Sequence, residues 1–183
     1  MKKFLIALLL TVSTVALAEG NYASIKFETR NGLNGTQDAN AYSLTVGQNV
    51  NKYLDAEVYA RVKSNDDDTN NTRTELALVA KDTYGAFTPY VRGAVGEKFD
   101  GSDNHSYWSV EPGVKVALTQ DWSVKAGLRF RDAFTTSNND STRTYRLGTE
   151  YAITKTASLS AGVDLQRGDS DYNTIGLGYN VKF

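Results

Sequence analysis

Charged residues that could attract ions or form ion pairs recur at alternate positions in short runs along this chain of 183 residues. The basic members of these runs are Lys26, Arg30, Arg61, Lys63, Arg73, Arg92, Lys115, Lys125, Arg129, Arg131 and Arg146. The acidic members are Glu28, Asp55, Glu57, Glu75, Glu111, Glu150 and Asp164. Eleven bases against seven acids leave an excess of about +4 on the surface that they share. Around a water-filled space such a surface favours anions, whereas in a packed interior the charges must pair.

Hydrolytic chemistry requires a nucleophile or an activated water beside a base. The single histidine, His105, is the candidate base, and Ser102 or Ser106 with Asp103 could complete a Ser-His-acid arrangement. The histidine lies in a predicted surface loop, where such a side chain is more often simply solvated. We therefore predict no enzymatic activity.

Metal binding is equally weakly indicated. The chain has no Cys and one His, so it offers no cluster of nitrogen and sulfur ligands for a transition metal. The run from Asp66 to Asp68 could bind a divalent cation or bridge one to lipopolysaccharide phosphates, but organised calcium loops space their ligands. A solvated acidic loop is the simpler interpretation, and we predict neither a metal nor a cofactor.

The charged positions alternate with apolar ones, and residues 53–63 show this best. Leu54, Ala56, Val58, Ala60 and Val62 share one parity, and charged residues and a tyrosine fill the other. Successive side chains of a strand point to opposite faces, so the pattern sorts into an apolar face and an ionic face. No second layer is available to cover the apolar face. Lipid would cover it in a transmembrane β-barrel, which is apolar outside and polar within.

The same alternation predicts ten strands, at residues 22–30, 40–48, 53–63, 73–82, 87–97, 107–118, 122–132, 143–152, 157–167 and 172–183. Long polar loops are expected at 31–38, 64–71, 98–105, 133–140 and 168–171, and tight turns between the other strands. These loops would carry the acids Asp38, Asp66, Asp67, Asp68, Asp100, Asp103, Asp140, Asp169 and Asp171. Outer-membrane barrels show this asymmetry, with short periplasmic turns and longer extracellular loops. We expect a closed, antiparallel, up-and-down barrel of about ten strands, with eight or twelve as the alternatives.

The first 18 residues are predicted to be a secretory signal peptide. Lys2 and Lys3 precede an apolar stretch that ends in Ala16-Leu17-Ala18, a small-residue cleavage site. The predicted domains are therefore a signal peptide at 1–18 and a barrel at 19–183. Removing two lysines changes the net charge from −1 to about −3, which gives no basic excess for nucleic-acid binding.

Aromatic and small residues occupy positions that suit such a barrel. Nine aromatic residues of apolar parity are expected to form two belts at the membrane interfaces: Phe87, Trp122, Tyr151, Tyr179 and Phe183 at the periplasmic ends, and Tyr42, Trp108, Phe130 and Tyr145 towards the extracellular ends. Small residues of polar parity would either leave room in the lumen or relieve strand curvature; they are Gly47, Ala94, Gly96, Gly113, Ala117, Gly127, Gly148, Gly162, Gly176 and Gly178.

The last strand resembles the C-terminal signature of bacterial outer-membrane barrels. Ile175, Leu177, Tyr179, Val181 and Phe183 alternate with polar or small residues up to the terminal Phe. The resemblance implies a bacterial outer-membrane location, contact with outer-membrane lipids and lipopolysaccharide, and recognition by the barrel-assembly machinery.

The segment 142–151 is similar in style to the small monomeric porins for acidic oligosaccharides such as oligogalacturonate or sialic acid, although those have twelve strands. Two functions stay open from the sequence. One is a narrow, anion-leaning channel for small solutes with a basic lumen. The other is a non-conducting structural or surface-interaction barrel with a packed, ion-paired interior.

Overall fold

The computed structural model describes residues 20–33, 38–65, 70–100, 103–135 and 140–183, which form ten strands. They are β1 (Asn21–Gly32), β2 (Ala39–Asn51), β3 (Leu54–Asn65), β4 (Asn70–Lys81), β5 (Phe87–Asp100), β6 (Asp103–Ala117), β7 (Trp122–Ala133), β8 (Thr142–Ala152), β9 (Ala157–Gly168) and β10 (Tyr172–Lys182). All ten predicted strands are confirmed. The predicted signal peptide lies outside the described residues and stays a prediction.

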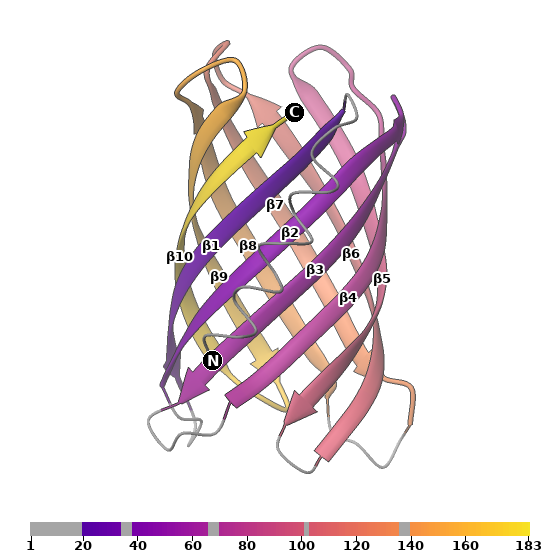
Figure 1. Cartoon of the computed structure of the whole chain (residues 1–183), viewed down its shortest axis with the longest axis vertical. Helices are drawn as coiled ribbons and strands as arrows, with labels where there is room; N and C mark the ends of the chain where they lie inside the picture. The colour runs from indigo at the N-terminus through magenta and orange to yellow at the C-terminus, as the bar shows by residue number, and fades with distance from the viewer. Residues whose placement is uncertain (1–19, 34–37, 66–69, 101–102, 136–139) are drawn as a thin grey trace.

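Each strand pairs with its neighbours in sequence, and β1 also pairs with β10, which closes the sheet (Figure 1). The closing register runs from Tyr22 opposite Lys182 to Gly32 opposite Tyr172. Closure leaves no edge strand with unpaired backbone groups, which a membrane-spanning sheet requires. The fold is therefore a closed, antiparallel, up-and-down barrel of ten strands, and the alternatives of eight and twelve are wrong.

One predicted long loop, at residues 98–105, is wrong. β5 continues to Asp100 and β6 begins at Asp103, and these two aspartates are paired across the hairpin. Polar composition indicates contact with water, but it does not indicate that strand pairing has ended. The two strands simply extend further, so Asp100 and Asp103 belong to strands.

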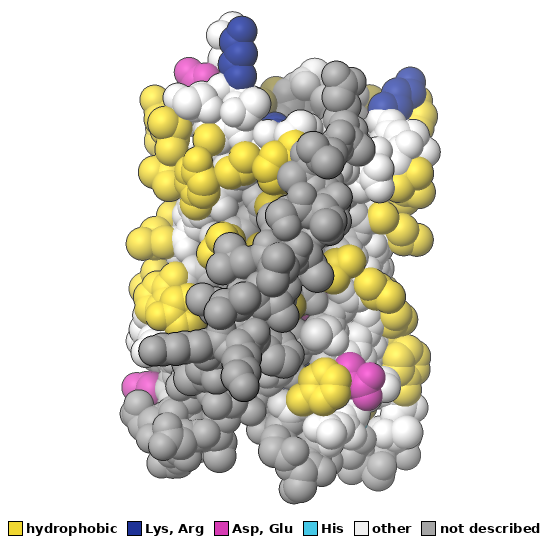
Figure 2. Space-filling model, viewed as in Figure 1, with side chains coloured by type: hydrophobic (Ala, Val, Ile, Leu, Met, Phe, Trp, Pro, Cys, Tyr) yellow, Lys and Arg dark blue, Asp and Glu magenta, His cyan; other side chains and the backbone are white. Residues whose placement is uncertain are grey.

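Side chains of alternate parity face opposite surroundings. On β10, Thr174 is 3 % exposed, whereas Ile175 and Leu177 are each 62 % exposed. The row from Leu54 to Val62 likewise belongs to the outer face, with Val58 exposed. On the face shown in Figure 2, hydrophobic side chains extend along the sides of the barrel, and the visible Lys and Arg side chains stand near the upper edge. The polar residues are inside and the apolar residues outside, the reverse of a soluble protein.

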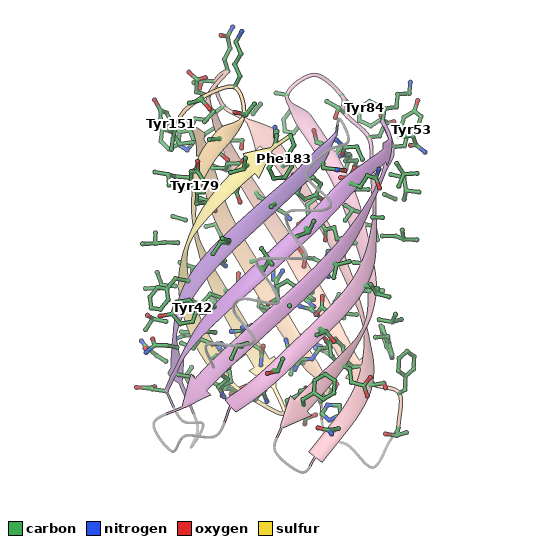
Figure 3. All side chains as sticks on the ribbon, viewed as in Figure 1. Tyr42, Tyr53, Tyr84, Tyr151, Tyr179 and Phe183 are labelled. Carbon is green, nitrogen blue, oxygen red and sulfur yellow. The ribbon has the colours of Figure 1, made fainter. Side chains whose placement is uncertain are left out.

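All nine aromatic residues predicted to form the belts are exposed. Tyr151, Tyr179 and Phe183 lie near the end of the barrel that carries the C-terminus, and Tyr42 lies towards the other end (Figure 3). Tyr53 and Tyr84, which were not predicted for the belts, join the first group. Rings at both ends match the interface girdles of a transmembrane barrel.

The short connections are held by local hydrogen bonds. In the turn before β7, the Thr119 hydroxyl accepts hydrogen bonds from the backbone N–H groups of Asp121 (3.3 Å) and Trp122 (3.0 Å). In the turn before β9, the Thr154 hydroxyl accepts from Thr156 (3.2 Å) and Ala157 (2.9 Å). These side chains satisfy backbone donors that the strand ladders leave unpaired. Within the described ranges, no helix is long and apolar enough to cross a membrane.

Loop aspartates perform the same task at the other end of the barrel. Asp38 accepts a hydrogen bond from the backbone N–H of Gly32 (2.8 Å), Asp169 from Ser141 (2.6 Å) and Asp171 from Gly168 (2.9 Å). These acids, predicted as loop residues, therefore also fix the backbone there. The possible cation-binding run Asp66 to Asp68 lies outside the described residues.

Candidate functional site

Inward side chains meet across the barrel at a repeated sequence separation of 35 residues. Because the strands of a barrel are tilted, a side chain reaches a residue two strands further on rather than its direct neighbour. Four contacts follow this rule: Tyr22 with Glu57 (2.7 Å), Arg92 with Glu57 (2.8 Å), Arg146 with Glu111 (2.8 Å) and Lys115 with Glu150 (2.6 Å). Barrel tilt and hairpin length together bring these predicted lumen residues into contact.

Glu75, on β4, is the centre of the tightest group. One carboxylate oxygen accepts a hydrogen bond from the Tyr107 hydroxyl (2.8 Å) and from the Arg129 guanidinium. The other oxygen pairs with Nη1 of Arg92 at 2.9 Å, and Arg92 also holds Glu57. Glu75 is 2 % exposed. A buried carboxylate is tolerated only where several donors compensate for its lost hydration, as they do here.

Glu111, on β6, is the centre of a second buried group. It accepts hydrogen bonds from the Tyr90 hydroxyl (3.0 Å) and from Nη1 of Arg146 (2.8 Å), and Lys125 lies 3.9 Å away. Nε of Arg146 lies 3.6 Å from Asp164 on β9. Together these contacts connect β5 to β9 across the lumen.

The remaining predicted carboxylates are also paired. Glu28 contacts Arg61 at 2.6 Å and Lys26 at 3.2 Å. Glu150 contacts Lys115 at 2.6 Å, in a pair that is more exposed than the Glu75 group. All eighteen lumen residues predicted from strand parity form an ion pair or a hydrogen bond inside the barrel or line its arginine-rich cavity. Their role in a conducting path stays a prediction.

Large inward side chains pack against the barrel wall at positions where the wall residue is glycine. A Cβ atom at Gly47 would overlap the Tyr22 ring, and one at Gly96 the Tyr107 ring. Tyr90 lies against Gly113 and Gly127 in the same way. The expectation that small residues leave room is therefore wrong at these four positions, because tyrosines occupy the space. At Gly148 and Gly162, which are cross-strand partners, only backbone atoms lie within 4 Å of such a Cβ.

Replacing Gly113 by Ala is expected to destabilise the barrel by about 1–3 kcal/mol, because the added methyl group overpacks a filled site. It would overlap the Tyr90 ring and lie 2.6 Å from the carbonyl oxygen of Ala126. Gly93→Ala is the matched control, since its methyl group meets no described atom within 4 Å, and its effect should stay within about 0.5 kcal/mol. Urea unfolding in lipid vesicles measures both. Equal effects of the two substitutions would contradict the packing described here.

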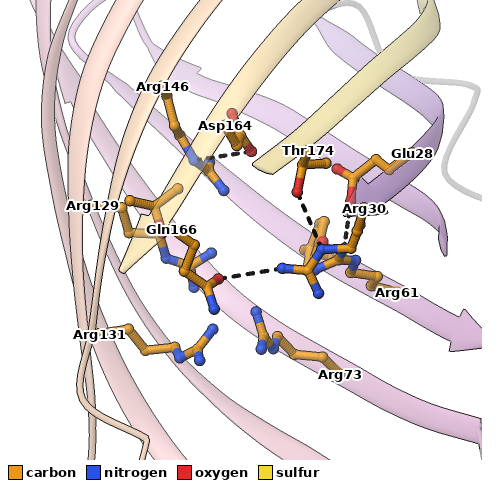
Figure 4. Close-up of a pocket in the computed structure, with 12 residues that line it drawn as sticks. Glu28, Arg30, Arg61, Arg73, Arg129, Arg131, Arg146, Asp164, Gln166 and Thr174 are labelled. Atoms are coloured by element: carbon orange, nitrogen blue, oxygen red, sulfur yellow. Dashed lines mark hydrogen bonds and ion pairs between the residues drawn. The ribbon is translucent and has the colours of Figure 1, made fainter. Parts of the chain in front are cut away.

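A narrow cavity of about 20 Å³ lies inside the barrel, and several of these paired groups form part of its wall (Figure 4). Its charged lining consists of six arginines and two carboxylates: Arg30, Arg61, Arg73, Arg129, Arg131, Arg146, Glu28 and Asp164. Tyr59, Thr144, Gln166 and Thr174 complete the wall. Within the described part of the chain, the Nε atoms of Arg73, Arg129, Arg131 and Arg146 are buried without a hydrogen-bond partner. The cavity therefore presents more donors and more positive charge than its own acceptors satisfy.

Arg30 and Arg73 contribute most directly to this excess. Arg30 donates to Thr174 (3.2 Å) and Gln166 (3.4 Å), and its guanidinium stacks 3.8 Å from the centre of the Tyr172 ring. Arg73 lies 5.4 Å from the centre of the Tyr107 ring. Neither arginine forms a salt bridge with a residue that the structure describes. The hydrogen-bond and ring partners of these two arginines are neutral, so no described carboxylate in direct contact compensates their charges.

His105 and Asp140 form a buried corner beside Arg131. The prediction of His105 as a solvated loop residue is wrong, whereas Asp140 lies in the predicted connection before β8 but is buried. His105 lies on β6, is 7 % exposed, and places Nε2 at 3.5 Å from a carboxylate oxygen of Asp140. Arg131 donates to the other oxygen at 2.5 Å. Because adjacent strand residues point to opposite faces, the outward Ser106 cannot act with His105 as nucleophile and base. The other candidate nucleophile, Ser102, lies outside the described residues.

Substituting Asp140 by Asn is expected to destabilise the barrel at neutral pH and to matter less in acid. Burial alone would raise the pKa of Asp140, but Arg131 and Arg73 lower it below its usual value. Lys98 acts in the same direction, and His105 also faces the carboxylate. A lowered pKa contributes stability above the unfolded value, and that contribution is lost as the pH falls through the folded value.

Urea midpoints of the wild type and of Asp140→Asn, measured from pH 7 down to pH 2, test this. The two curves should begin to converge below about pH 4, and they should meet only once the pH has fallen through the lowered pKa of the folded Asp140 carboxylate. A difference that stays constant over the whole range would show that the charge of Asp140 does not contribute.

The family model of the outer membrane protein beta-barrel domain matches residues 4–183. The chain belongs to this family. The match covers the whole barrel, and it establishes the location of this outer-membrane barrel as the bacterial outer membrane. No curated protein sequence matches the chain.

Solved outer-membrane barrels share the fold of this family member at low sequence identity. An outer membrane channel from Pseudomonas putida F1 superimposes with a TM-score of 0.61 at 9 % identity, covering 92 % of this chain and 97 % of that one. The KdgM porin, in complex with disordered oligogalacturonate, gives 0.54 at 12 %, covering 88 % and 99 %. The NanC porin gives 0.53 at 9 %, covering 88 % and 100 %. These similar structures are two porins and a channel.

Some inward residues of this outer-membrane barrel were missed in the sequence. One of them is Lys81, which forms an ion pair with Asp55 at 2.5 Å. Lys81 has the same parity as Arg73 and Glu75 on β4, so the alternation could have predicted its inward position. Tyr22, Tyr90, Tyr107 and Tyr172 also point inward. A tyrosine carries no charge and suits either face, so only its parity could have indicated its place.

Proposed function

We propose that this barrel is a narrow outer-membrane channel that favours small anions. The observation that carries the proposal is the cavity lining, where six arginines accompany two carboxylates. Guanidinium groups stay charged at any physiological pH. Inside a wall of low dielectric constant, their fields are focused rather than screened by bulk water. An anion in this space is stabilised and a cation is repelled.

The distribution of partners supports this proposal. Glu57, Glu75 and Glu111 each bond several donors, so their charges are already compensated. Arg30 and Arg73, nearer the loop end, form no ion pair with a described residue, and their hydrogen-bond and ring partners are neutral. An anion entering from the loops would therefore meet uncompensated positive charge first.

The size of the space favours small solutes. Ten strands enclose a narrow lumen, between the filled interiors of eight-stranded barrels and the aqueous channels of porins with sixteen to eighteen. The bare backbone at Gly148 and Gly162 supplies a stretch of wall without side chains. The KdgM porin was crystallised with oligogalacturonate, an acidic sugar polymer. At 12 % identity this shared fold is an analogy, and it supports only the general idea of anionic solutes.

A second candidate function, a non-conducting structural barrel, is favoured by one observation. The rings of Tyr22, Tyr90 and Tyr107 fill the space above inward glycines, and their hydroxyl groups donate hydrogen bonds to the inward glutamates Glu57, Glu111 and Glu75. These packed tyrosine rings stiffen the barrel wall and narrow the lumen. The two functions differ in whether ions pass.

Chloride efflux from proteoliposomes separates the two functions. Vesicles are loaded with potassium chloride, and valinomycin carries potassium so that chloride release is limited only by the barrel. The channel proposal predicts release well above that of vesicles containing heat-unfolded protein. Release at the level of that control from folded barrels would reject the channel and favour the structural function.

A further inference from the structure

Two arginines face the membrane rather than the lumen. On β8, Thr142 and Thr144 are buried and Arg143 between them is exposed. On β9, Gln166 is buried, and Arg167 follows it on the opposite face. Every other Lys and Arg on the described strands has the inward parity, so Arg143 and Arg167 are the exceptions. They are also direct cross-strand partners. A single exposed base is common, but two paired ones on a lipid-facing surface require an explanation.

Their position along the strands places them at headgroup depth. On the outer face of β8 and β9, Leu147 pairs with Val163, Tyr145 with Leu165, and then Arg143 with Arg167. Arg143 also pairs with Phe130 of the extracellular aromatic belt on β7. Two strand residues span about 6–7 Å. The guanidinium groups therefore lie at the outer edge of the aromatic belt, where the lipid acyl chains end and the charged headgroups of the outer leaflet begin.

The two charges have no anionic partner among the described residues. Arg167 donates to the backbone carbonyls of Gln166 (2.6 Å) and Tyr172 (3.2 Å) and to the side-chain oxygen of Asn173 (2.9 Å), all of them neutral. Asp132, on the outer face of β7, forms no ion pair with either arginine. Like charges directly opposite each other on a sheet are destabilising, and more so beside lipid. The pair therefore requires an anion from outside the chain.

We infer that Arg143 and Arg167 together bind a phosphate group of lipid A, the lipid anchor of lipopolysaccharide in the outer leaflet. Arginine forms bidentate hydrogen bonds with phosphate, and two guanidiniums match the double charge of a phosphate monoester. The contacts of Arg167, on β9 and β10, are all neutral and leave its charge uncompensated. Tyr145, Leu165 and Phe130 lie next to the pair and offer an apolar surface to the acyl chains. The site does not depend on whether the barrel conducts.

Native mass spectrometry of the folded barrel in detergent tests this inference. The probes are bisphosphorylated lipid A, dephosphorylated lipid A, phosphatidylglycerol and inorganic phosphate. Wild-type protein should bind bisphosphorylated lipid A at least about tenfold more tightly than the other probes, since charge-assisted hydrogen bonds are involved. The double variant Arg143→Gln/Arg167→Gln should bind bisphosphorylated lipid A about tenfold more weakly than the wild type does. Lys52→Gln/Lys155→Gln, which removes two charges from turns at the opposite end, should bind like the wild type.

Several results would overturn the inference. Equal binding of phosphorylated and dephosphorylated lipid A would show that acyl chains alone are recognised. Equally tight binding of phosphatidylglycerol would show that the site has no preference for lipid A. Equally tight binding of inorganic phosphate would show that the site binds a free anion. Unchanged affinity of the double variant, with folding checked by its heat-dependent gel mobility, would locate binding elsewhere. The comparison of probes on wild-type protein stays decisive even if the variant does not fold.

Discussion

Replacing Glu75 by Ala is expected to lower the free energy of unfolding of the barrel by about 3–5 kcal/mol. The carboxylate accepts from Arg92, Arg129 and Tyr107, and it is almost completely buried. Its removal leaves two guanidinium groups close together without their shared counter-charge. The cost arises from these uncompensated charges rather than from the lost contacts alone.

Glu150→Ala is the matched control for this substitution. It also removes an inward glutamate that is paired with a base, here Lys115 at 2.6 Å, but both side chains are substantially exposed. Its expected cost is no more than about 1 kcal/mol, because water screens the pair and hydrates the remaining lysine. Urea unfolding in lipid vesicles, followed by the fluorescence of Trp108 and Trp122, measures both. Similar costs for the two variants would contradict the buried network around Glu75.

Replacing Arg73 by Gln is expected to reduce the anion-to-cation permeability ratio about thirtyfold, with little change in stability. A unit charge about 8 Å from a permeating ion contributes about 1 kcal/mol at an effective dielectric constant of about 40. The contribution is favourable for an anion and unfavourable for a cation, so the ratio changes by about 2 kcal/mol, which corresponds to that factor. Arg73 lies in the cavity wall and forms no salt bridge with a described residue. Its removal therefore changes the field of the lumen without leaving a buried carboxylate unpaired.

Two other substitutions separate this electrostatic effect from general damage. Lys155→Gln removes one charge from a turn between β8 and β9, away from the cavity, and should leave selectivity unchanged. Arg92→Gln leaves Glu57 and Glu75 without a shared partner, so it should reduce stability more than selectivity. Reversal potentials in planar bilayers give the permeability ratio. A permeability ratio that is unaffected by Arg73→Gln would show that the cavity does not lie on the path of the ions.

The fold could be predicted from the sequence because alternate residues of each strand face two different surroundings, lipid outside and the polar lumen inside. Val58 and Ile175 face outward and Arg61 and Thr174 face inward, as their alternation predicts. The terminal Phe183 and the aromatic belts also have positions that local sequence can define. Each of these features depends on strand periodicity, so no knowledge of the register across the barrel is needed.

The site could be predicted only as a set of inward residues. Which base meets which acid depends on strand tilt and register, and Tyr22, Glu57 and Arg92 meet because they lie on β1, β3 and β5 at intervals of 35 residues. The polar neighbours of His105 predict a loop, although β6 extends through this residue. The pairing of Arg143 with Arg167 likewise became visible only with the register of β8 and β9.

The reversal potential of the wild-type barrel in a planar bilayer under a potassium chloride gradient tests the proposed function most directly. The arginine-lined cavity predicts small current steps whose reversal potential shifts towards the chloride equilibrium potential. A shift towards the potassium equilibrium potential, or the absence of steps from barrels shown to be inserted and folded, would contradict an anion-favouring channel.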